Sequence, residues 1–184
     1  MHDQQLIISG VGGQGILFVT RILAETAIRT GMPVMTSETH GMAQRGGVVI
    51  SHLKAGAFAS PLVGTASADG LLLLKGENLP LHRHFLRPSG WVVMNAKEPP
   101  AGLDGHPVHW VDADGLALDL GTPQGVNLIL LGFALERLGH AGLLFCTPPE
   151  VLVTLEVRLA DKGALKAASL KALRAGMKAG SGAP

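Results

Sequence analysis

The order of apolar and polar residues along the chain predicts alternating strands and helices. Residues 5–9 form an apolar run that ends at Gly10, as expected of a buried strand. Apolar residues then recur three or four positions apart from residue 16 to residue 30, which predicts a helix, and a second strand follows at 33–37. This strand–helix–strand unit predicts a parallel pair joined by a right-handed crossover, as at the start of a Rossmann-like fold.

The next segment departs from that scheme. Residues 38–47 are too short and too rich in glycine for a crossover helix, and residues 48–53 alternate apolar and polar positions. Residues 54–56 predict a tight turn into a further strand at 57–63. Because a parallel crossover needs about a dozen residues or more, the strand at 48–53 is expected to run antiparallel to its predecessors. The predicted sheet is therefore mixed.

The remaining pattern completes one α/β domain over residues 1–179. Residues 125–138 are apolar on every side, so this helix is expected between two layers or in a subunit interface. Further strands are predicted at 69–75, 91–95 and 108–111, and further helices at 77–86, 148–159 and 163–178. The predicted architecture is a single-domain, Rossmann-like three-layer sandwich with a mixed, mostly parallel sheet. Residues 180–184 are expected to form a disordered tail.

Composition excludes several classes of protein. The formal net charge is +1, which is too small for a general nucleic-acid binder. Cys146 is the only cysteine, so the chain alone holds neither a disulfide framework nor an iron–sulfur cluster. The eight histidines show no metal-ligand spacing, and no metal site is predicted. With no signal-peptide pattern and no apolar run of membrane-spanning length, the protein is expected to be cytoplasmic, without a membrane partner.

A glycine-rich loop follows the first predicted strand. Its glycines fit the G-x-G-x-x-G pattern of dinucleotide-binding folds, in which the N–H groups of a helix start face a phosphate. The candidate binding residues are Gly10, Gly12, Gly13, Gln14 and Gly15. A tight turn that binds nothing explains the same glycines.

A dehydrogenase or a P-loop enzyme fits the sequence poorly. Glu38 ends the second strand, near where an acid binds the ribose hydroxyls of NAD. However, the chain has no tyrosine for a Tyr–Lys catalytic pair and no second domain for a hydride acceptor. No Gly-Lys-Ser/Thr follows the glycines, as a P-loop would require.

The second loop carries the most distinctive string of the chain, His-Gly-Met-Ala-Gln-Arg-Gly-Gly. Glu38, two residues before this string, is a candidate binding residue, and the string supplies the remaining ones: His40, Gly41, Gln44, Arg45, Gly46 and Gly47. The Arg45 guanidinium suits a phosphate or carboxylate, and bare glycine backbone lets such a ligand approach. An ion pair with Glu38 is the alternative interpretation for Arg45. His40, the one candidate catalytic residue, is a general acid/base, a polar contact to a bound group, or a brace for the loop through a hydrogen bond.

The two loops are expected to lie together if the first two strands are neighbours. Each loop leaves the carboxyl end of its strand, and open α/β sheets bind ligands at that edge. Together the loops resemble the gamma domain of the 2-oxoacid:ferredoxin oxidoreductases, through Gly-Val-Gly-Gly-Gln-Gly at 10–15 and Thr-Ser-Glu-Thr-His-Gly-Met-Ala-Gln-Arg-Gly-Gly at 36–47. Gln-Gly-Val-Asn at 124–127 is also similar to that family. His40 and Gln44 differ from the pyruvate branch and resemble the small subunit of the indolepyruvate branch.

The resemblance implies a cofactor-free gamma-type subunit that is inactive alone. The family is thiamine diphosphate-dependent and oxidatively decarboxylates a 2-oxoacid to an acyl-CoA, with electrons passed to ferredoxin. Thiamine diphosphate, Mg and [4Fe–4S] clusters are expected in a large partner subunit. The gamma piece is expected to help bind coenzyme A and to complete the active-site region. A stand-alone Rossmann-like nucleotide- or flavin-binding protein is the alternative that the first loop alone supports.

Overall fold

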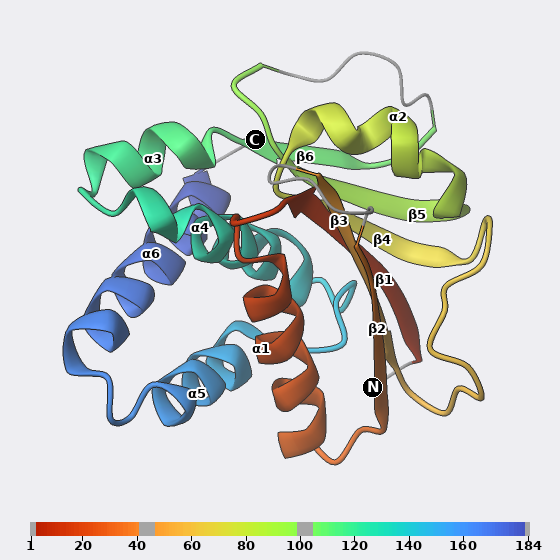
Figure 1. Cartoon of the computed structure of the whole chain (residues 1–184), viewed down its shortest axis with the longest axis horizontal. Coiled ribbons are helices and arrows are strands. Elements are labelled where there is room, and N and C mark those ends of the chain that lie inside the picture. The colour runs from red at the N-terminus through yellow and green to blue at the C-terminus, as the bar shows by residue number, and fades with distance from the viewer. Residues whose placement is uncertain (1–2, 41–46, 99–104, 183–184) are drawn as a thin grey trace.

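The computed structural model describes residues 3–40, 47–98 and 105–182, which form an α/β fold around one six-stranded sheet (Figure 1). The strands are β1 (Gln4–Val11), β2 (Val34–His40), β3 (Val48–Ala55), β4 (Ala68–Leu73), β5 (Leu86–Asn95) and β6 (Val108–Val111). Their order across the sheet is β2-β3-β1-β4-β5-β6. β3 runs antiparallel to β1 and β2, and the pairs β1–β4, β4–β5 and β5–β6 are parallel. The mixed, mostly parallel sheet is confirmed.

The predicted parallel pairing of the first two strands is wrong, because β3 lies between β1 and β2. The antiparallel direction expected of the third strand is confirmed. Since β1 and β2 both run antiparallel to β3, they point the same way. Their carboxyl ends therefore still lie at one edge of the sheet, with the start of β3 between them.

Residues 57–63 form no strand, so that prediction is also wrong. β3 continues to Ala55, and Gly56, with a φ of 127°, ends it. The chain then passes over one face of the sheet without regular structure. Val63 is buried there, and its N–H donates to Nδ1 of His52 at 3.2 Å. Val63 is the one buried residue of this segment and Leu62 is 54% exposed, so apolar residues there do not mark a strand.

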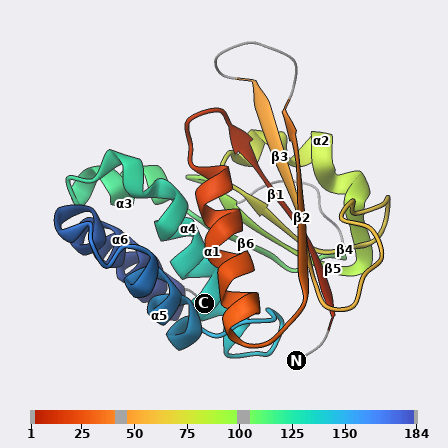
Figure 2. The same cartoon turned by 60° about the horizontal axis from the view of Figure 1, so that its bottom comes forward.

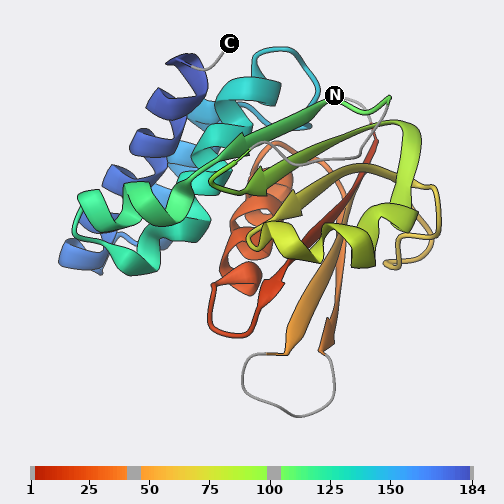
Figure 3. The same cartoon turned by 90° about the horizontal axis from the view of Figure 1, so that it is seen from above.

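Helices cover both faces of the sheet (Figures 1 and 3). They are α1 (Ile16–Arg29), α2 (Leu79–His82), α3 (Ala113–Asp119), α4 (Val126–Ala134), α5 (Pro148–Arg158) and α6 (Gly163–Gly182). The larger core joins α1, α3, α4, α5 and α6 to one face, and the smaller core packs α2 on the other. Ile7 of β1 lies in the smaller core and Ile8 in the larger, as the alternation of a strand requires. This arrangement has the three layers expected.

The apolar helix is buried, as its sequence predicts. Every residue of α4 from Asn127 to Ala134 is buried, and a π-helical turn, Leu135–Gly139, continues it. α4 packs against α6, which runs through Gly182. Residues 180–182 are therefore helical and not part of a disordered tail. None of the helices in the described ranges is long and apolar enough to cross a bilayer.

Candidate functional site

The first glycine-rich loop and the described ends of the second, His40 and Gly47, meet at the carboxyl edge of the sheet. β1 ends beside the start of β3, since Val11 is the register partner of Val48, and His40 at the end of β2 is paired with Val49. The N–H of Gly12 donates to the carbonyl of Gly47 at 3.1 Å, which joins the first loop to the last residue of the second. Figure 2 shows the ends of β1 and β2 and the start of β3 at the same end of the sheet. The expected shared edge is therefore present.

Gln14 holds the first loop in shape. Its Oε1 accepts from the N–H of Val11 at 2.8 Å, and its Nε2 donates to the carbonyl of Leu74 at 3.4 Å. The loop is thereby tied to the end of β4. A β-carbon at Gly10 would lie 3.0 Å from the Leu74 β-carbon, so Gly10 is needed for close packing. These two candidate residues support the loop more than they offer groups to a ligand.

The remaining glycines of the loop differ in their surroundings. Gly15 begins α1 with a φ of 79°, and a β-carbon there would strike the side-chain amide of Asn127. Asn127 Nδ2 also donates to the carbonyl of Gly15 at 3.4 Å. Gly13 has a φ of 93°, is exposed, and has no neighbouring atom within 4 Å of where a β-carbon would stand. Gly13 therefore presents bare backbone at the edge of the sheet, whereas Gly12 is exposed but already donates its N–H to Gly47.

A polar cluster supports the loop from beneath. His82 Nε2 lies 2.7 Å from Ser9 Oγ, and Asn78 Nδ2 donates to Ser9 Oγ at 3.2 Å and to the carbonyl of Gly10 at 3.3 Å. Burial lowers the pKa of His82, and the neighbouring His84 and His52 lower it further. The imidazole is therefore held neutral, and the cluster fixes the end of β1 and the start of the loop.

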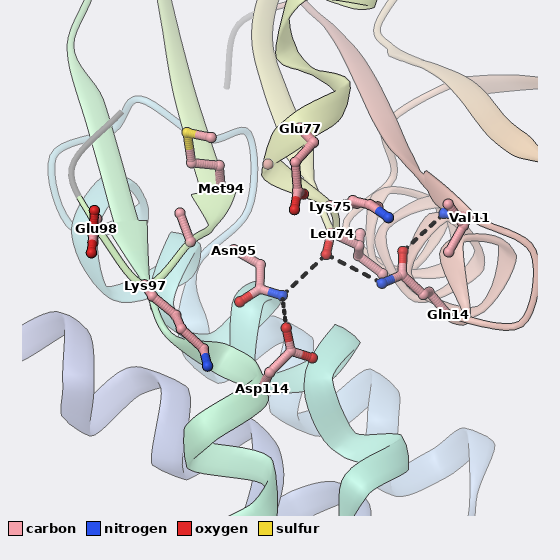
Figure 4. A pocket seen from close by; sticks show the side chains of 12 residues that line it. Val11, Gln14, Leu74, Lys75, Glu77, Met94, Asn95, Lys97, Glu98 and Asp114 are labelled. Carbon is pink, nitrogen blue, oxygen red and sulfur yellow. Dashed lines mark hydrogen bonds between the residues drawn. The ribbon is translucent and has the colours of Figure 1, made fainter. Parts of the chain in front are cut away.

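One cleft opens on the β4 side of the loop, at the ends of β1, β4 and β5 (Figure 4). This strand-end cleft has a volume of about 640 Å³. Asn95 organises its floor: Nδ2 donates to the Leu74 carbonyl at 3.2 Å and to Asp114 Oδ2 at 2.8 Å, and Oδ1 accepts from the N–H of Ala113 at 2.9 Å. The charged side chains that line the cleft are of both signs, namely Lys75, Lys97, Glu77, Glu98 and Asp114. Such a mixed lining does not favour a strongly anionic ligand.

A second cleft opens on the other side of the loop, at the start of α1. This helix-start cleft has a volume of about 510 Å³ and is lined by Gly12, Gly13, Gly15, Ile16, Leu17, Phe18, Arg21 and Val49. Arg21 is exposed, is the one charged residue in that lining, and has no carboxylate partner among the described residues. The first turn of α1 has no acidic residue, so the positive end of the helix dipole adds to the charge of Arg21. This cleft suits an anion better than the strand-end cleft does.

Sequence reasoning missed Arg21, although a signal was available. Arg21 lies one helical turn after Leu17, so both side chains fall on the face of α1 that borders the cleft. The strand-end residues Asn95 and Asp114 were missed as well. They lie 19 positions apart, and only the fold brings them together.

The other predicted site residues fall into two groups. Glu38 is exposed on β2, opposite Ser51 of β3, and lines neither cleft. β3 separates it from the first loop, so it does not stand beside the glycines as an acid in a dinucleotide site would. The side chain of His40 and residues Gly41, Gln44, Arg45 and Gly46 lie outside the described residues. Cys146 is buried, and burial raises the pKa of its thiol far above the usual range, so it is no nucleophile.

Comparison with known proteins decides the family. The model of the family described as pyruvate ferredoxin/flavodoxin oxidoreductase matches residues 5–179. The chain belongs to this family. The resemblance inferred from the two loops is thereby confirmed, and it extends over nearly the whole chain.

Curated relatives of this family member are named as indolepyruvate oxidoreductase subunits. The chain is 39% identical over 98 residues to indolepyruvate oxidoreductase subunit IorB of Archaeoglobus fulgidus, covering 52% of the chain and 49% of that protein. It is 30% identical over 154 residues to the subunit IorB of Thermococcus kodakarensis, covering 72% of the chain and 76% of that protein. The chain thus spans about half the length of the first relative and three quarters of the second.

Solved structures share the fold. A 2-oxoglutarate:ferredoxin oxidoreductase from Magnetococcus marinus, with 2-oxoglutarate, coenzyme A and succinyl-CoA bound, gives a TM-score of 0.82 at 19% identity over the whole chain and 32% of that protein. The gamma subunit of a keto/oxoacid ferredoxin oxidoreductase from Geobacter sulfurreducens gives a TM-score of 0.76 at 22% identity, covering 98% of the chain and 99% of the subunit. The fold of this pyruvate ferredoxin/flavodoxin oxidoreductase family member is therefore that of a known gamma subunit.

The family-like strings meet in space. Asn127, the last residue of the Gln-Gly-Val-Asn string, lies against Gly15, the last glycine of the first loop. Gly47, the last residue of the second string, accepts a hydrogen bond from Gly12. Three strings that are far apart in the sequence thus converge on the start of α1.

Proposed function

We propose that the chain is the gamma-type subunit of a thiamine diphosphate-dependent 2-oxoacid:ferredoxin oxidoreductase, and that it binds to a large partner subunit that carries the cofactors. The family match over residues 5–179 carries this proposal. The relatives named as indolepyruvate oxidoreductase subunits favour an aryl 2-oxoacid such as indolepyruvate as the substrate of the complex.

The residues of the chain support this division of labour. The sequence has no Gly-Asp-Gly followed by Asn, the motif that holds thiamine diphosphate and its metal ion, and its single cysteine is buried. In the complex, thiamine diphosphate would supply the decarboxylation chemistry, and [4Fe–4S] clusters would supply a path for electrons to ferredoxin. In the proposed complex these groups, and Mg, belong to the large subunit.

The helix-start cleft is the place that we propose for coenzyme A. Three features support it: the bare backbone of Gly13, the start of α1, and the positive charge of Arg21. Gly47, at the end of the second loop, accepts a hydrogen bond from Gly12, which lines this cleft, and we propose that Arg45 adds a second guanidinium to it. Coenzyme A carries phosphate groups, and the mixed charges of the strand-end cleft suit them less well. His40 then serves as a contact to the bound group or to the large subunit, and Glu38, which lines neither cleft, as a contact to the large subunit.

Substitution of the two arginines tests the coenzyme A site. In the complex reconstituted with the large subunit, Arg21→Ala and Arg45→Ala should each raise the Michaelis constant for coenzyme A. Loss of a charge-assisted hydrogen bond of about 1.5–3 kcal/mol corresponds to a roughly ten- to hundredfold increase. Arg45→Lys should recover only part of the loss, because an ammonium cannot form two parallel hydrogen bonds to one phosphate. Arg83→Ala, an exposed arginine outside both clefts, is the control.

Other outcomes would contradict the proposed site. An unchanged Michaelis constant, combined with weaker subunit association in Arg45→Ala, would assign the second loop to the subunit interface. An unchanged Michaelis constant for coenzyme A in both variants would show that coenzyme A does not bind in the helix-start cleft. A flavin absorbance spectrum in the chain purified alone would favour the stand-alone nucleotide- or flavin-binding protein instead.

A further inference from the structure

Three exposed apolar side chains lie along the seam between α1 and α5. Ile28 in the last turn of α1 is 63% exposed, and Val153 and Val157 of α5 are 46% and 56% exposed. Val153 and Val157 are one helical turn apart and therefore lie on one face of α5. Figures 1 and 2 show the two helices side by side on the outer side of the molecule. Apolar side chains gathered in this way mark an interaction surface more often than scattered ones do.

The seam is hollowed into a groove. One hollow of about 430 Å³ is lined by Ile28, Arg29, Thr154, Val157 and others, and a second of about 280 Å³ is lined by Thr26, Arg29, Glu150 and Val153 among others. Arg29 borders both, so the hollows adjoin. We call them together the α1–α5 groove.

The hydroxyl groups at the floor of the groove already have partners. Thr26 Oγ1 donates to the carbonyl of Ile22 at 2.8 Å, and Thr154 Oγ1 lies 3.0 Å from the carbonyl of Glu150 and from Thr26 Oγ1. The hydroxyl groups of the floor therefore need no hydrogen bond from a ligand. An apolar side chain fits it best.

The border of the groove carries an excess of positive charge. Arg29 and Lys162 have no carboxylate partner in the described part of the chain, whereas Arg158 is paired with Glu25. The carboxylate of Glu150 is engaged as well, because it accepts from the N–H and the hydroxyl of Thr147. A partner that brings carboxylates to Arg29 and Lys162 would complement these charges.

We propose that the α1–α5 groove seats an amphipathic helix of the large partner subunit, with an apolar stripe flanked by carboxylates. A helix places side chains at positions i, i+4 and i+7 along a groove between two other helices, and the apolar stripe covers Ile28, Val153 and Val157. This inference rests on the proposed function, since it names a contact of the same complex. The groove is separate from the coenzyme A site: α1 has 14 residues, so its two ends lie about 20 Å apart.

Assembly of the complex tests the proposal. Val157→Glu should weaken binding to the large subunit about tenfold or more, because it places a carboxylate in the apolar centre of the interface. Leu118→Glu is the matched control, since Leu118 is 68% exposed on α3 and lies outside the groove. Arg29→Glu with Lys162→Glu should weaken binding to a similar degree and should reduce its dependence on salt. Thermal unfolding of each isolated variant checks that its fold is intact.

A photo-crosslinking residue at position 153 identifies the occupant. The proposal expects a crosslink, in the assembled complex, to a helical segment of the large subunit that contains both apolar and acidic residues. A crosslink to a second copy of this chain, or to a segment without acidic residues, would overturn it. Equal binding by Val157→Glu and Leu118→Glu would also overturn it, although the proposed function would stand if the wild-type complex forms and turns over. If the wild-type chain does not bind the large subunit at all, both proposals fail.

Discussion

Gly13 and Gly15 both have positive φ angles, 93° and 79°, but only Gly15 has a side chain packed against it. Gly13→Ala should therefore cost only the backbone strain, about 1 kcal/mol of unfolding free energy. Gly15→Ala should cost about 2 kcal/mol or more, because its methyl group would also displace the amide of Asn127. Urea unfolding of the two variants measures the difference. Equal losses of unfolding free energy in the two variants would mean that the Asn127 side chain can move aside without destabilising the fold.

The sequence predicted this loop as a unit but not the separate roles of its glycines. Gly15 is restricted by Asn127, which lies 112 positions along the chain, and Gly10 by the end of β4. Local sequence shows that glycine is needed at a turn. Local sequence does not show which neighbouring residue makes glycine necessary, because that residue comes into contact only in the folded chain.

His82 should make the fold sensitive to acid. Burial lowers its pKa in the folded chain below the ordinary value of 6.5. The unfolded chain therefore takes up the proton first, so the stabilisation is complete above about pH 6.5 and is lost as the pH falls below it. We expect the midpoint temperature of thermal unfolding to be lower at about pH 5.5 than at about pH 7.5.

Substitution of His82 tests whether this residue causes the acid sensitivity. His82→Gln should reduce the decrease of the unfolding temperature at low pH without abolishing it, since burial also lowers the pKa of His52 and of His109. His84→Gln, which changes an exposed neighbour, should keep most of the slope. If His82→Gln leaves the slope as it is, His82 contributes nothing to the acid response.

At the scale of secondary-structure elements, the contact between α4 and α6 depends on glycine. A β-carbon at Gly176 would strike the carbonyl of Ile129, which is backbone and cannot move aside. Gly176→Ala should destabilise the chain by about 1–3 kcal/mol despite the better helix propensity of alanine. Gly163→Ala, at the start of the same helix with open space around it, should be neutral or slightly stabilising. Similar unfolding midpoints for the two variants would show that the helices can separate at little cost.

Most strands and the longer helices could be predicted, whereas short helices and irregular segments could not. The strand at 108–111, the apolar helix at 125–138 and the two closing helices are present near their predicted bounds. α3 was missed because it has only seven residues and contains a glycine, and its start depends on the Asp112 side chain, which accepts from the N–H of Gly115 at 2.8 Å. The helix expected at 77–86 is four residues of α2 between two 3-10 turns.

At the scale of the whole molecule, the edge that carries both loops followed from strand direction, although the strand order did not. The antiparallel course of β3 could be argued from the short loop at 38–47. The position of β3 between β1 and β2 could not be predicted, because a strand that pairs with one neighbour and a strand that pairs with two have the same sequence pattern. The clefts on either side of the first loop also depend on Asn95, Asp114 and Arg21, which no motif identified.

We propose that the chain is a subunit whose complex does chemistry that the chain cannot do alone. The most direct measurement is 2-oxoacid-dependent reduction of a viologen dye, with indolepyruvate, pyruvate and coenzyme A supplied. We expect no turnover by the isolated chain and robust turnover when it is combined with the large subunit. Turnover by the isolated chain would rule out this subunit role, because neither a thiamine diphosphate motif nor a cysteine cluster is present in its sequence.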